Sequence, residues 1–369
     1  NRLGYCESIR ATNPCGEQPL PPYGACLLGS INLAQLVDAP FTPRARLDHE
    51  RLADAVTTAV RLLDDIIDVS RFPLPAQAAE AHAKRRMGLG VTGLASALVL
   101  CGQAYDSEAG RALADDWLAQ LSRAAYLASA DLAAEKGSFP LFDRDAHLAR
   151  LEEQGVASDV REAVAAKGLR NGLLTSIAPT GTISLLAGNV SSGIEPVFSR
   201  SYRRRILESP GQARETVVED FAWRLWRQTR TAAQPADPPG LVTAEDIAPA
   251  DHVRMQAVAQ RHIDSSISKT INVPRTMSFA AFKDVYLLAH ELGCKGCTTY
   301  RPNDITGAVL TASPVDQDDA DDPHAVPPPG TPPPIPPVAT AVCPRCGEAA
   351  IQHLESCAVC AQCGFSACA

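Results

Sequence analysis

The sequence predicts an α/β fold, because segments with helical periodicity alternate along the chain with short, apolar, β-branched runs. From Leu47 to Val69 the apolar residues recur every three or four positions, with charged residues between them. A second helix is expected from Glu108 to Lys136, ending at Gly137, a residue that suits a helix C-terminus. Further helices are predicted at 216–230, 251–263 and 278–292, and buried strands at 173–178, 268–273 and 297–301.

Composition narrows the class of protein. The chain has 369 residues, 46% of them hydrophobic and 21% charged, as in ordinary globular proteins with more than one domain. Its net charge of −8 argues against a nucleic-acid partner and favours a small anionic ligand. No apolar run approaches membrane-spanning length and no signal peptide is visible, so we expect a cytoplasmic protein with no membrane partner.

The pentapeptide Asn13-Pro14-Cys15-Gly16-Glu17 places a carboxamide, a thiol and a carboxylate at alternate positions. In an extended strand or a tight finger, these three side chains project from one side and converge on one ligand. Pro14 and Gly16 are equally typical of an ordinary turn, and a cysteine is often a small buried hydrophobe. The residues alone leave both interpretations open.

This pentapeptide and the run from Gln18 to Leu33 resemble the active-site segment of adenosylcobalamin-dependent (class II) ribonucleotide reductases. Further similar blocks follow in order at 85–94, 178–184, 268–274 and 293–301. The resemblance covers residues 1 to about 310 and extends to the cysteine-rich tail. It implies that residues 1–310 are the C-terminal part of the family's ten-stranded α/β barrel. The chain is therefore expected to be a fragment, inactive alone, of an enzyme that is homodimeric at full length.

The resemblance implies reduction of ribonucleotides, as diphosphates, to 2′-deoxyribonucleotides for DNA synthesis and repair, by a thiyl-radical mechanism initiated by adenosylcobalamin. Class I enzymes need a Tyr-Tyr pair near the C-terminus, and class III enzymes need a glycyl-radical loop and lack an acid at Glu17; neither feature matches this sequence. A class III-like radical reductase, or an inactive remnant with a zinc-ribbon interaction module, remains an alternative. Cobalamin binding is inferred only through the family, since no Asp-x-His-x-x-Gly motif occurs.

Four residues receive catalytic roles from the resemblance. Cys15 would lose its hydrogen to a radical derived from the cofactor and then abstract the ribose 3′-hydrogen. Glu17 would be the general base for the 3′-hydroxyl, and Asn13 would hydrogen-bond the ribose hydroxyls and Glu17. Cys26 would be one half of the dithiol that supplies reducing equivalents, with its partner upstream.

The segment 178–184 follows an apolar run and precedes a predicted helix start, where free N–H groups and hydroxyls suit an anion. With the resemblance, Thr180, Gly181, Thr182 and Ser184 become the expected cradle for the substrate's phosphates. The basic runs 84–86 and 203–205 are left unassigned, because charge runs are usually solvated faces.

Four other cysteines of the body are expected to be structural. Cys6 and Cys101 are interpreted as core residues. Cys294 and Cys297 form a C-x-x-C without a second pair close by, so core or strand-edge positions are favoured over a metal or redox role.

The tail, residues 342–369, contains six cysteines, and two C-x-x-C-G sequences predict a tetrahedral zinc site. One arrangement binds zinc through Cys343, Cys346, Cys360 and Cys363 and leaves Cys357 and Cys368 as a free pair. The alternative uses Cys357 and Cys360 as the second knuckle and leaves Cys363 and Cys368. The free pair fits a redox shuttle that reduces a disulfide at Cys26 and is itself reduced by thioredoxin or glutaredoxin.

A linker is predicted between body and tail, at 311–341. Five aspartates lie between Asp316 and Asp322, and nine prolines between Pro323 and Pro337. Such a segment buries too little apolar surface to offset its ordering entropy, so we expect an extended, flexible tether. A shuttle that travels to an active site needs such a tether.

Overall fold

The computed structural model describes residues 1–209, 212–302, 311–312, 343, 345–347, 351–354, 357–360, 362–363 and 366–368. Internal contacts divide the chain into two units, Asn1–Val315 and Asp316–Ala369, which are described separately. Among the described residues, no helix is both long enough and apolar enough to cross a membrane.

Ten α-helices are described in the first unit, together with the 3-10 helix η1 (Leu33–Leu36). The predicted helices near 47–69, 108–136, 251–263 and 278–292 are confirmed, with small shifts at their ends. The ten are α1 (His49–Val69), α2 (Pro75–Lys84), α3 (Leu94–Leu100), α4 (Glu108–Lys136), α5 (Arg144–Glu153), α6 (Ser158–Lys167), α7 (Gly181–Leu186), α8 (Phe221–Thr229), α9 (Pro249–Gln260) and α10 (Phe279–Glu291).

The predicted helix at 216–230 is wrong in its first part. Residues up to Glu219 belong to β8 (Gln212–Glu219), which pairs antiparallel with β7 (Ser201–Ser209). The β-branched run Thr216-Val217-Val218 suits a strand. Helix α8 begins only after Asp220, whose side chain accepts hydrogen bonds from the N–H groups of Ala222 and Trp223.

A parallel strand array forms the centre of the first unit. Strand β3 (Leu27–Asn32) pairs with β6 (Met87–Thr92), with Leu27 opposite Met87. Isolated parallel bridges then join Leu89 to Thr175 and Ile177 to Ile267, so the predicted strand at 173–178 is present only as two bridge residues beside the pair. Strand β9 (Thr270–Asn272) pairs parallel with β10 (Thr298–Tyr300), close to the predicted positions. Helices connect these strands, which confirms the mixed α/β content.

The other strands of this unit are short and antiparallel. Strand β1 (Ala11–Thr12) pairs with β2 (Pro19–Leu20), and β4 (Val37–Asp38) pairs with β5 (Arg46–Leu47). Strand β11 (Thr311–Ala312) pairs with β7. These two residues are the only described part of the predicted linker 311–341; the remainder of that prediction lies outside the described residues.

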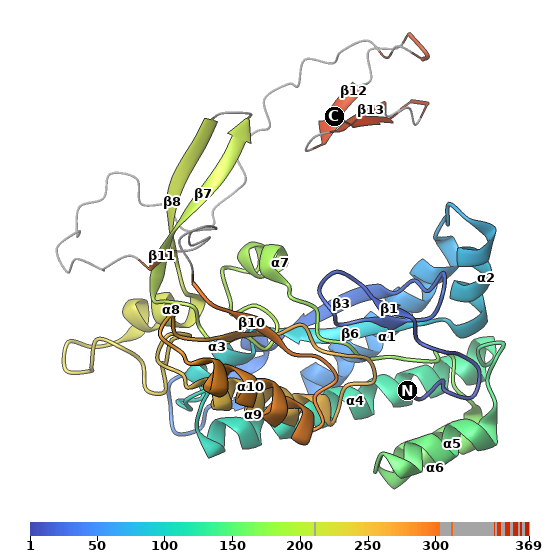
Figure 1. Ribbon diagram of the computed structural model, residues 1–369, viewed down its shortest axis with the longest axis horizontal. Coiled ribbons are helices and arrows are strands. Elements are labelled where there is room, and N and C mark those ends of the chain that lie inside the picture. The colour runs from blue at the N-terminus through green and yellow to red at the C-terminus, as the bar shows by residue number, and fades with distance from the viewer. Residues whose placement is uncertain are drawn as a thin grey trace. The chain divides into compact units, whose positions relative to one another are not determined.

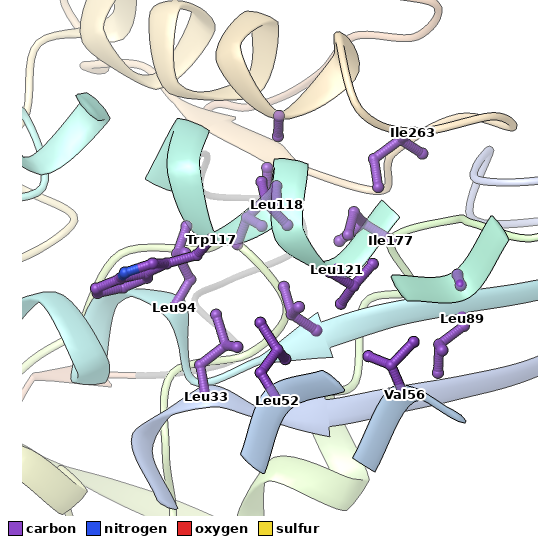
Figure 2. Packing of buried hydrophobic residues seen from close by; sticks show 14 of the residues in the cluster. Leu33, Leu52, Val56, Leu89, Leu94, Trp117, Leu118, Leu121, Ile177 and Ile263 are labelled. Atoms are coloured by element: carbon purple, nitrogen blue, oxygen red, sulfur yellow. The ribbon is translucent and has the colours of Figure 1, made fainter. Parts of the chain in front are cut away.

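The hydrophobic core lies between the parallel pair β3–β6 and the long helices. Helix α1 packs against both strands and against α4, and Figure 1 shows α4 and α7 on opposite sides of the pair. A Cβ on Gly29 would contact Leu63 of α1 at 3.3 Å, so this face of β3 is closely covered. Figure 2 shows side chains from α1, α4, β6 and η1 meeting in this core, among them Leu33, Leu52, Leu89 and Trp117.

Gly90 in β6 is a position where only glycine fits. A Cβ there would lie 2.1 Å from the backbone oxygen of Ser176, and a backbone atom held in the array cannot move aside. We therefore expect Gly90→Ala to lower the free energy of unfolding by about 2 kcal/mol or more. Gly181→Ala is the matched control, because a Cβ there meets nothing within 4 Å, and it should stay within about 0.5 kcal/mol of wild type. Guanidinium denaturation measures both; equal stabilities would contradict the steric argument.

The described part of the second unit includes a small antiparallel sheet. Strands β12 (Ile351–Leu354), β13 (Cys357–Cys360) and β14 (Ser366–Cys368) are arranged in sequence order. In this sheet Cys357 is paired in register with Cys368.

Candidate active site

The pentapeptide forms the tip of a tight hairpin between β1 and β2. The N–H of Asn13 donates to the carbonyl of Gln18 at 3.1 Å, and the N–H of Gln18 donates to Asn13 Oδ1 at 3.0 Å. Gly16 has φ +82°, a conformation that glycine adopts without strain. Asn13 Oδ1 therefore closes the turn. Cys15 is exposed at the tip, whereas Glu17 is only 2% exposed.

The hairpin is fixed to the parallel array by its two buried residues. The carbonyl of Glu17 accepts hydrogen bonds from Ser176 Oγ and the N–H of Ser266, each at 2.9 Å. The side chain of Gln18 accepts one from Ser265 Oγ at 3.3 Å. A Cβ on Gly88 would come within 2.5 Å of Gln18 Nε2, so this glycine provides the space that the hairpin occupies above β6.

Two buried polar atoms of the hairpin have no hydrogen-bond partner among the described residues, Glu17 Oε2 and Gln18 Nε2. Leaving such atoms unpaired costs about 1–3 kcal/mol each, more when the group is charged. Their burial beside an exposed thiol is therefore best explained by a ligand that offers both a donor and an acceptor. A carboxylate placed in this way can accept a proton from a ligand hydroxyl.

Cys26 lies directly before β3, near the hairpin. Its thiol is half-buried and donates to the carbonyl of Leu27 at 3.4 Å. Burial raises the pKa of this thiol to about 12; the nearby Arg86 opposes that rise and Glu17 adds to it. The thiol is thus protonated at neutral pH and stands between opposite charges.

The basic run 84–86, left unassigned from the sequence, does not form a solvated face, since all three residues are 4% exposed. Lys84 Nζ lies 3.0 Å from a Glu7 oxygen, and Arg86 Nη2 lies 2.5 Å from the same oxygen. Arg85 pairs with the buried Asp64 at 2.8 Å. Ion pairing makes this burial tolerable, because each buried cation has a carboxylate partner.

The turn predicted at 178–184 is shorter than expected, because α7 begins at Gly181, inside that segment, and not after Ser184. Thr180 adopts a left-handed conformation with φ +53°. Its hydroxyl lies 2.9 Å from that of Thr92 and accepts a hydrogen bond from the N–H of Gly193 at 2.7 Å. The hydroxyl of Thr180 therefore anchors the turn.

The remaining residues of the predicted phosphate cradle divide into two groups. Ser184 is buried, with its hydroxyl 2.9 Å from that of Ser192 and 3.2 Å from the carbonyl of Gly181. Gly181 and Thr182 are exposed. The structure thus brings all four predicted residues to one turn and leaves the exposed pair open to a ligand.

Four cysteines of the tail form a compact cluster in the second unit. The Sγ atoms of Cys343, Cys346, Cys360 and Cys363 all lie within 4.8 Å of one another. The Sγ atoms of Cys343 and Cys363 are 3.8 Å apart, and those of Cys346 and Cys360 are 3.7 Å apart. Although burial opposes ionisation, the N–H groups of Cys346 and Arg345 bring the pKa of the Cys343 thiol down to about 7. This grouping matches the first of the two predicted arrangements.

The other cysteines of the body pack as hydrophobic residues. Cys6 and Cys101 contact the main core, and Cys294 and Cys297 contact a smaller cluster that includes Val253. Burial raises the pKa of the Cys101 and Cys294 thiols to about 11. These surroundings agree with a structural role.

Comparison with known proteins places this arrangement in a family. Residues 1–300 match the family described as "Ribonucleotide reductase, barrel domain". The chain belongs to this family. The ribonucleotide reductase match covers the mixed helix and strand content of the first unit and ends before the cysteine cluster of the second unit.

Several longer proteins are similar to this barrel-domain chain. A protein of Mycobacterium tuberculosis (strain ATCC 25618 / H37Rv) named "Vitamin B12-dependent ribonucleoside-diphosphate reductase" is 39% identical, over 82% of this chain and 42% of its own length. A protein of the same name from Thermoplasma acidophilum is 35% identical, over 82% of this chain and 39% of its own length. The chain thus spans less than half the length of these relatives.

Sequence reasoning missed several residues of this barrel-domain site. Ser176 and Ser266 anchor the hairpin, and Arg86 lies beside Cys26, yet none was selected from the sequence. For Arg86 a signal existed, because the basic run leads directly into a strand that is buried at every position. A cation at that position is buried from water and therefore needs an ion-pair or hydrogen-bond partner.

Proposed function

We propose that the complete protein reduces ribonucleotides, as diphosphates, to 2′-deoxyribonucleotides, and that this chain carries the residues at which the reaction occurs. The observation that carries the proposal is the hairpin tip, where the exposed Cys15 stands two residues from the buried, unpaired carboxylate oxygen of Glu17. The names of the relatives support the same reaction and a diphosphate substrate.

The fold proposal is that residues 1–310 form the C-terminal part of a ten-stranded α/β barrel, followed by a linker at 311–341 and a redox tail at 342–369. The parallel array from β3 through β6 to the segments around Thr175 and Ile267 supports it. In such an array the hairpin lies on the face of β6 where Gly88 leaves space, a position suited to a barrel interior.

In the proposed reaction each group of the hairpin has a separate task. Cys15, as a thiyl radical, takes the ribose 3′-hydrogen, and Glu17 accepts the proton of the 3′-hydroxyl through its unpaired Oε2. Asn13 keeps the turn closed through Oδ1, which leaves its Nδ2 group to donate a hydrogen bond to the ribose. Fixing Glu17 through its carbonyl holds the base in place before substrate arrives.

Vitamin B12 dependence, in the names of the relatives, supports adenosylcobalamin as the cofactor. When bound, it would supply the one-electron chemistry that converts Cys15 to its radical form. One observation fits this requirement: Cys15 is exposed at the hairpin tip, so a bulky group can approach its sulfur. We assign none of the described residues to hold it.

We propose that the turn at 178–184 holds the substrate's phosphates. Gly181 and Thr182 are exposed and present a backbone N–H and a hydroxyl, while Thr180 and Ser184 hold the turn in shape. Gly181 has nothing within 4 Å of its Cβ position, which leaves space for an anion to approach the backbone.

We propose that the electrons that reduce the substrate are supplied through Cys26 and the cysteines of the tail. Cys26 forms a disulfide with a second thiol as the substrate is reduced, and the pair Cys357 and Cys368 then reduces that disulfide. Their pairing in register on adjacent strands supports treating these two cysteines as one unit. Thioredoxin or glutaredoxin would regenerate the dithiol by exchange.

Zinc is proposed for the cluster of Cys343, Cys346, Cys360 and Cys363. Four thiolates at the zinc–sulfur distance of about 2.3 Å in a tetrahedron lie about 3.8 Å apart. The Cys343–Cys363 and Cys346–Cys360 sulfur–sulfur separations, 3.8 Å and 3.7 Å, fit this geometry. The low pKa of Cys343 also favours the thiolate that binds metal.

The experiment that tests the function is an anaerobic assay of the complete gene product with adenosylcobalamin, a dithiol reductant and each ribonucleoside di- and triphosphate. We expect deoxynucleotide formation that depends on the cofactor and is faster with diphosphates. Equal activity without adenosylcobalamin would contradict the cofactor, and no product with any substrate would favour the inactive alternative.

Cys368→Ser tests the shuttle in the same protein. A single turnover, which uses electrons already stored at the active site, should proceed at the wild-type rate. Turnover driven by thioredoxin should fall by at least about 100-fold, because the exchange step loses one of its two sulfurs. Ala367→Ser, on the same strand, is the control for a change of polarity. An unchanged steady-state rate in Cys368→Ser would exclude the shuttle.

A further inference from the structure

Arg86 and Cys26 occupy matching positions at the start of two paired strands. Because Leu27 lies opposite Met87 and Leu28 opposite Gly88, the parallel register brings the preceding residues, Cys26 and Arg86, next to each other. A Cβ on Gly88 would contact Leu28 and Gln18, which shows that this face of the pair points to the hairpin. Side chains two positions apart share a face, so Cys26 and Arg86 are expected to point to the hairpin as well.

The guanidinium of Arg86 is only partly engaged. Nη2 is held 2.5 Å from Glu7 Oε2, while Nη1 is buried and has no partner among the described residues. Glu7 is itself fixed by Lys84 and by the side chain of Asn1. Nη2 is therefore held by Glu7, and Nη1 can donate a hydrogen bond to a group at the site.

Two charges act on the sulfur of Cys26 from different elements. Arg86 approaches from the start of β6, and Glu17 approaches from the hairpin. Glu7 contacts Arg86, and Lys84 contacts both Glu7 and Glu80. Arg86 is thus the cation that a negative charge on Cys26 would meet.

We infer that Arg86 is a positioning residue for the redox chemistry of Cys26, with its free Nη1 stabilising the sulfur when it becomes a thiolate. The inference rests on the proposed role of Cys26 in thiol–disulfide exchange. One thiolate of an incoming dithiol attacks the sulfur bonded to Cys26 and forms a new S–S bond with it, while the old S–S bond breaks and Cys26 leaves with the electron pair. Arg86 donates a charge-assisted hydrogen bond to that leaving thiolate, and its guanidinium stays protonated.

The test measures the reactivity of Cys26 in this chain, without turnover. Iodoacetamide alkylates thiolates, and mass spectrometry of peptides gives the rate for Cys26 separately at each pH between about 8 and 10. Arg86→Gln should slow alkylation of Cys26 about tenfold, which corresponds to about one pKa unit. Glu17→Gln removes the opposing charge and should accelerate it several-fold. Arg86→Lys, which keeps the charge, should lie between wild type and Arg86→Gln.

A slower alkylation of Cys26 in Arg86→Gln and a faster one in Glu17→Gln would show an effect of charge. Loosened packing would instead expose Cys26 and accelerate its alkylation in both variants. Cys101, a half-buried thiol that neither charge contacts, is the internal reference and should react at an unchanged rate in all variants. A faster or unchanged rate at Cys26 in Arg86→Gln, with Cys101 unchanged, would overturn the inference. Because the assay involves neither cofactor nor ribonucleotide, its failure is distinct from a failure of the proposed function.

Discussion

Cys15→Ser is expected to abolish ribonucleotide reduction by the complete protein, lowering its turnover rate by more than about 10³-fold. This loss exceeds the effect of removing one hydrogen-bond donor at an active site. The O–H bond of serine is too strong to serve as the hydrogen donor in place of a thiol. Cys15 is exposed at the hairpin tip, so the substitution leaves the packing of Glu17 and Gln18 intact. Substrate affinity, measured by equilibrium dialysis, should therefore change little.

Cys101→Ser is the matched control for Cys15→Ser. It makes the same chemical change in a thiol that packs against the core away from the hairpin, and it should retain activity. Residual turnover of Cys15→Ser above a few per cent of wild type would contradict the proposed radical role of Cys15. This conclusion does not depend on the result of the cofactor assay.

Loss of zinc from the tail is the second large effect that we expect. Cys363→Ser should weaken zinc binding by more than about 100-fold, since even residues behind the ligands cost 10–100-fold. Cys357→Ser should retain zinc, because Cys357 is not one of the four proposed ligands. A small module held by a metal unfolds without it, so Cys363→Ser should also abolish shuttle-dependent turnover.

The comparison of these two variants decides between the two predicted ligand sets. Metal content of the purified chain, measured by mass spectrometry after dialysis against a weak chelator, gives the answer directly. Retention by Cys363→Ser together with loss from Cys357→Ser would establish the alternative set, in which Cys357 and Cys360 form the second knuckle.

Much of the fold was predictable because its signals are local. The amphipathic pattern of α1 and the Gly137 end of α4 each reside within one segment, and the structure confirmed both. The prediction failed where a local pattern was ambiguous. The run before Asp220 reads as a helix by periodicity, but its pairing with β7 makes it a strand.

The candidate site was predictable only in part. The residues proposed to react, Cys15, Glu17 and Cys26, stood out through their chemistry and their setting in a recognisable motif. Their surroundings did not, because Ser176 and Ser266 are ordinary residues in sequence and acquire meaning only by contacting a hairpin more than a hundred positions away.

The sequence by itself determined the family resemblance, the order of helices and strands, and which side chains have the right chemistry. Only the tertiary structure decided that Glu17 is buried with an unpaired oxygen, that Gly88 makes room for the hairpin, and that Arg86 enters the site of Cys26. The reason is physical: burial, strand register and ion pairing are set by contacts between distant segments, and they determine the charge and reactivity of each side chain.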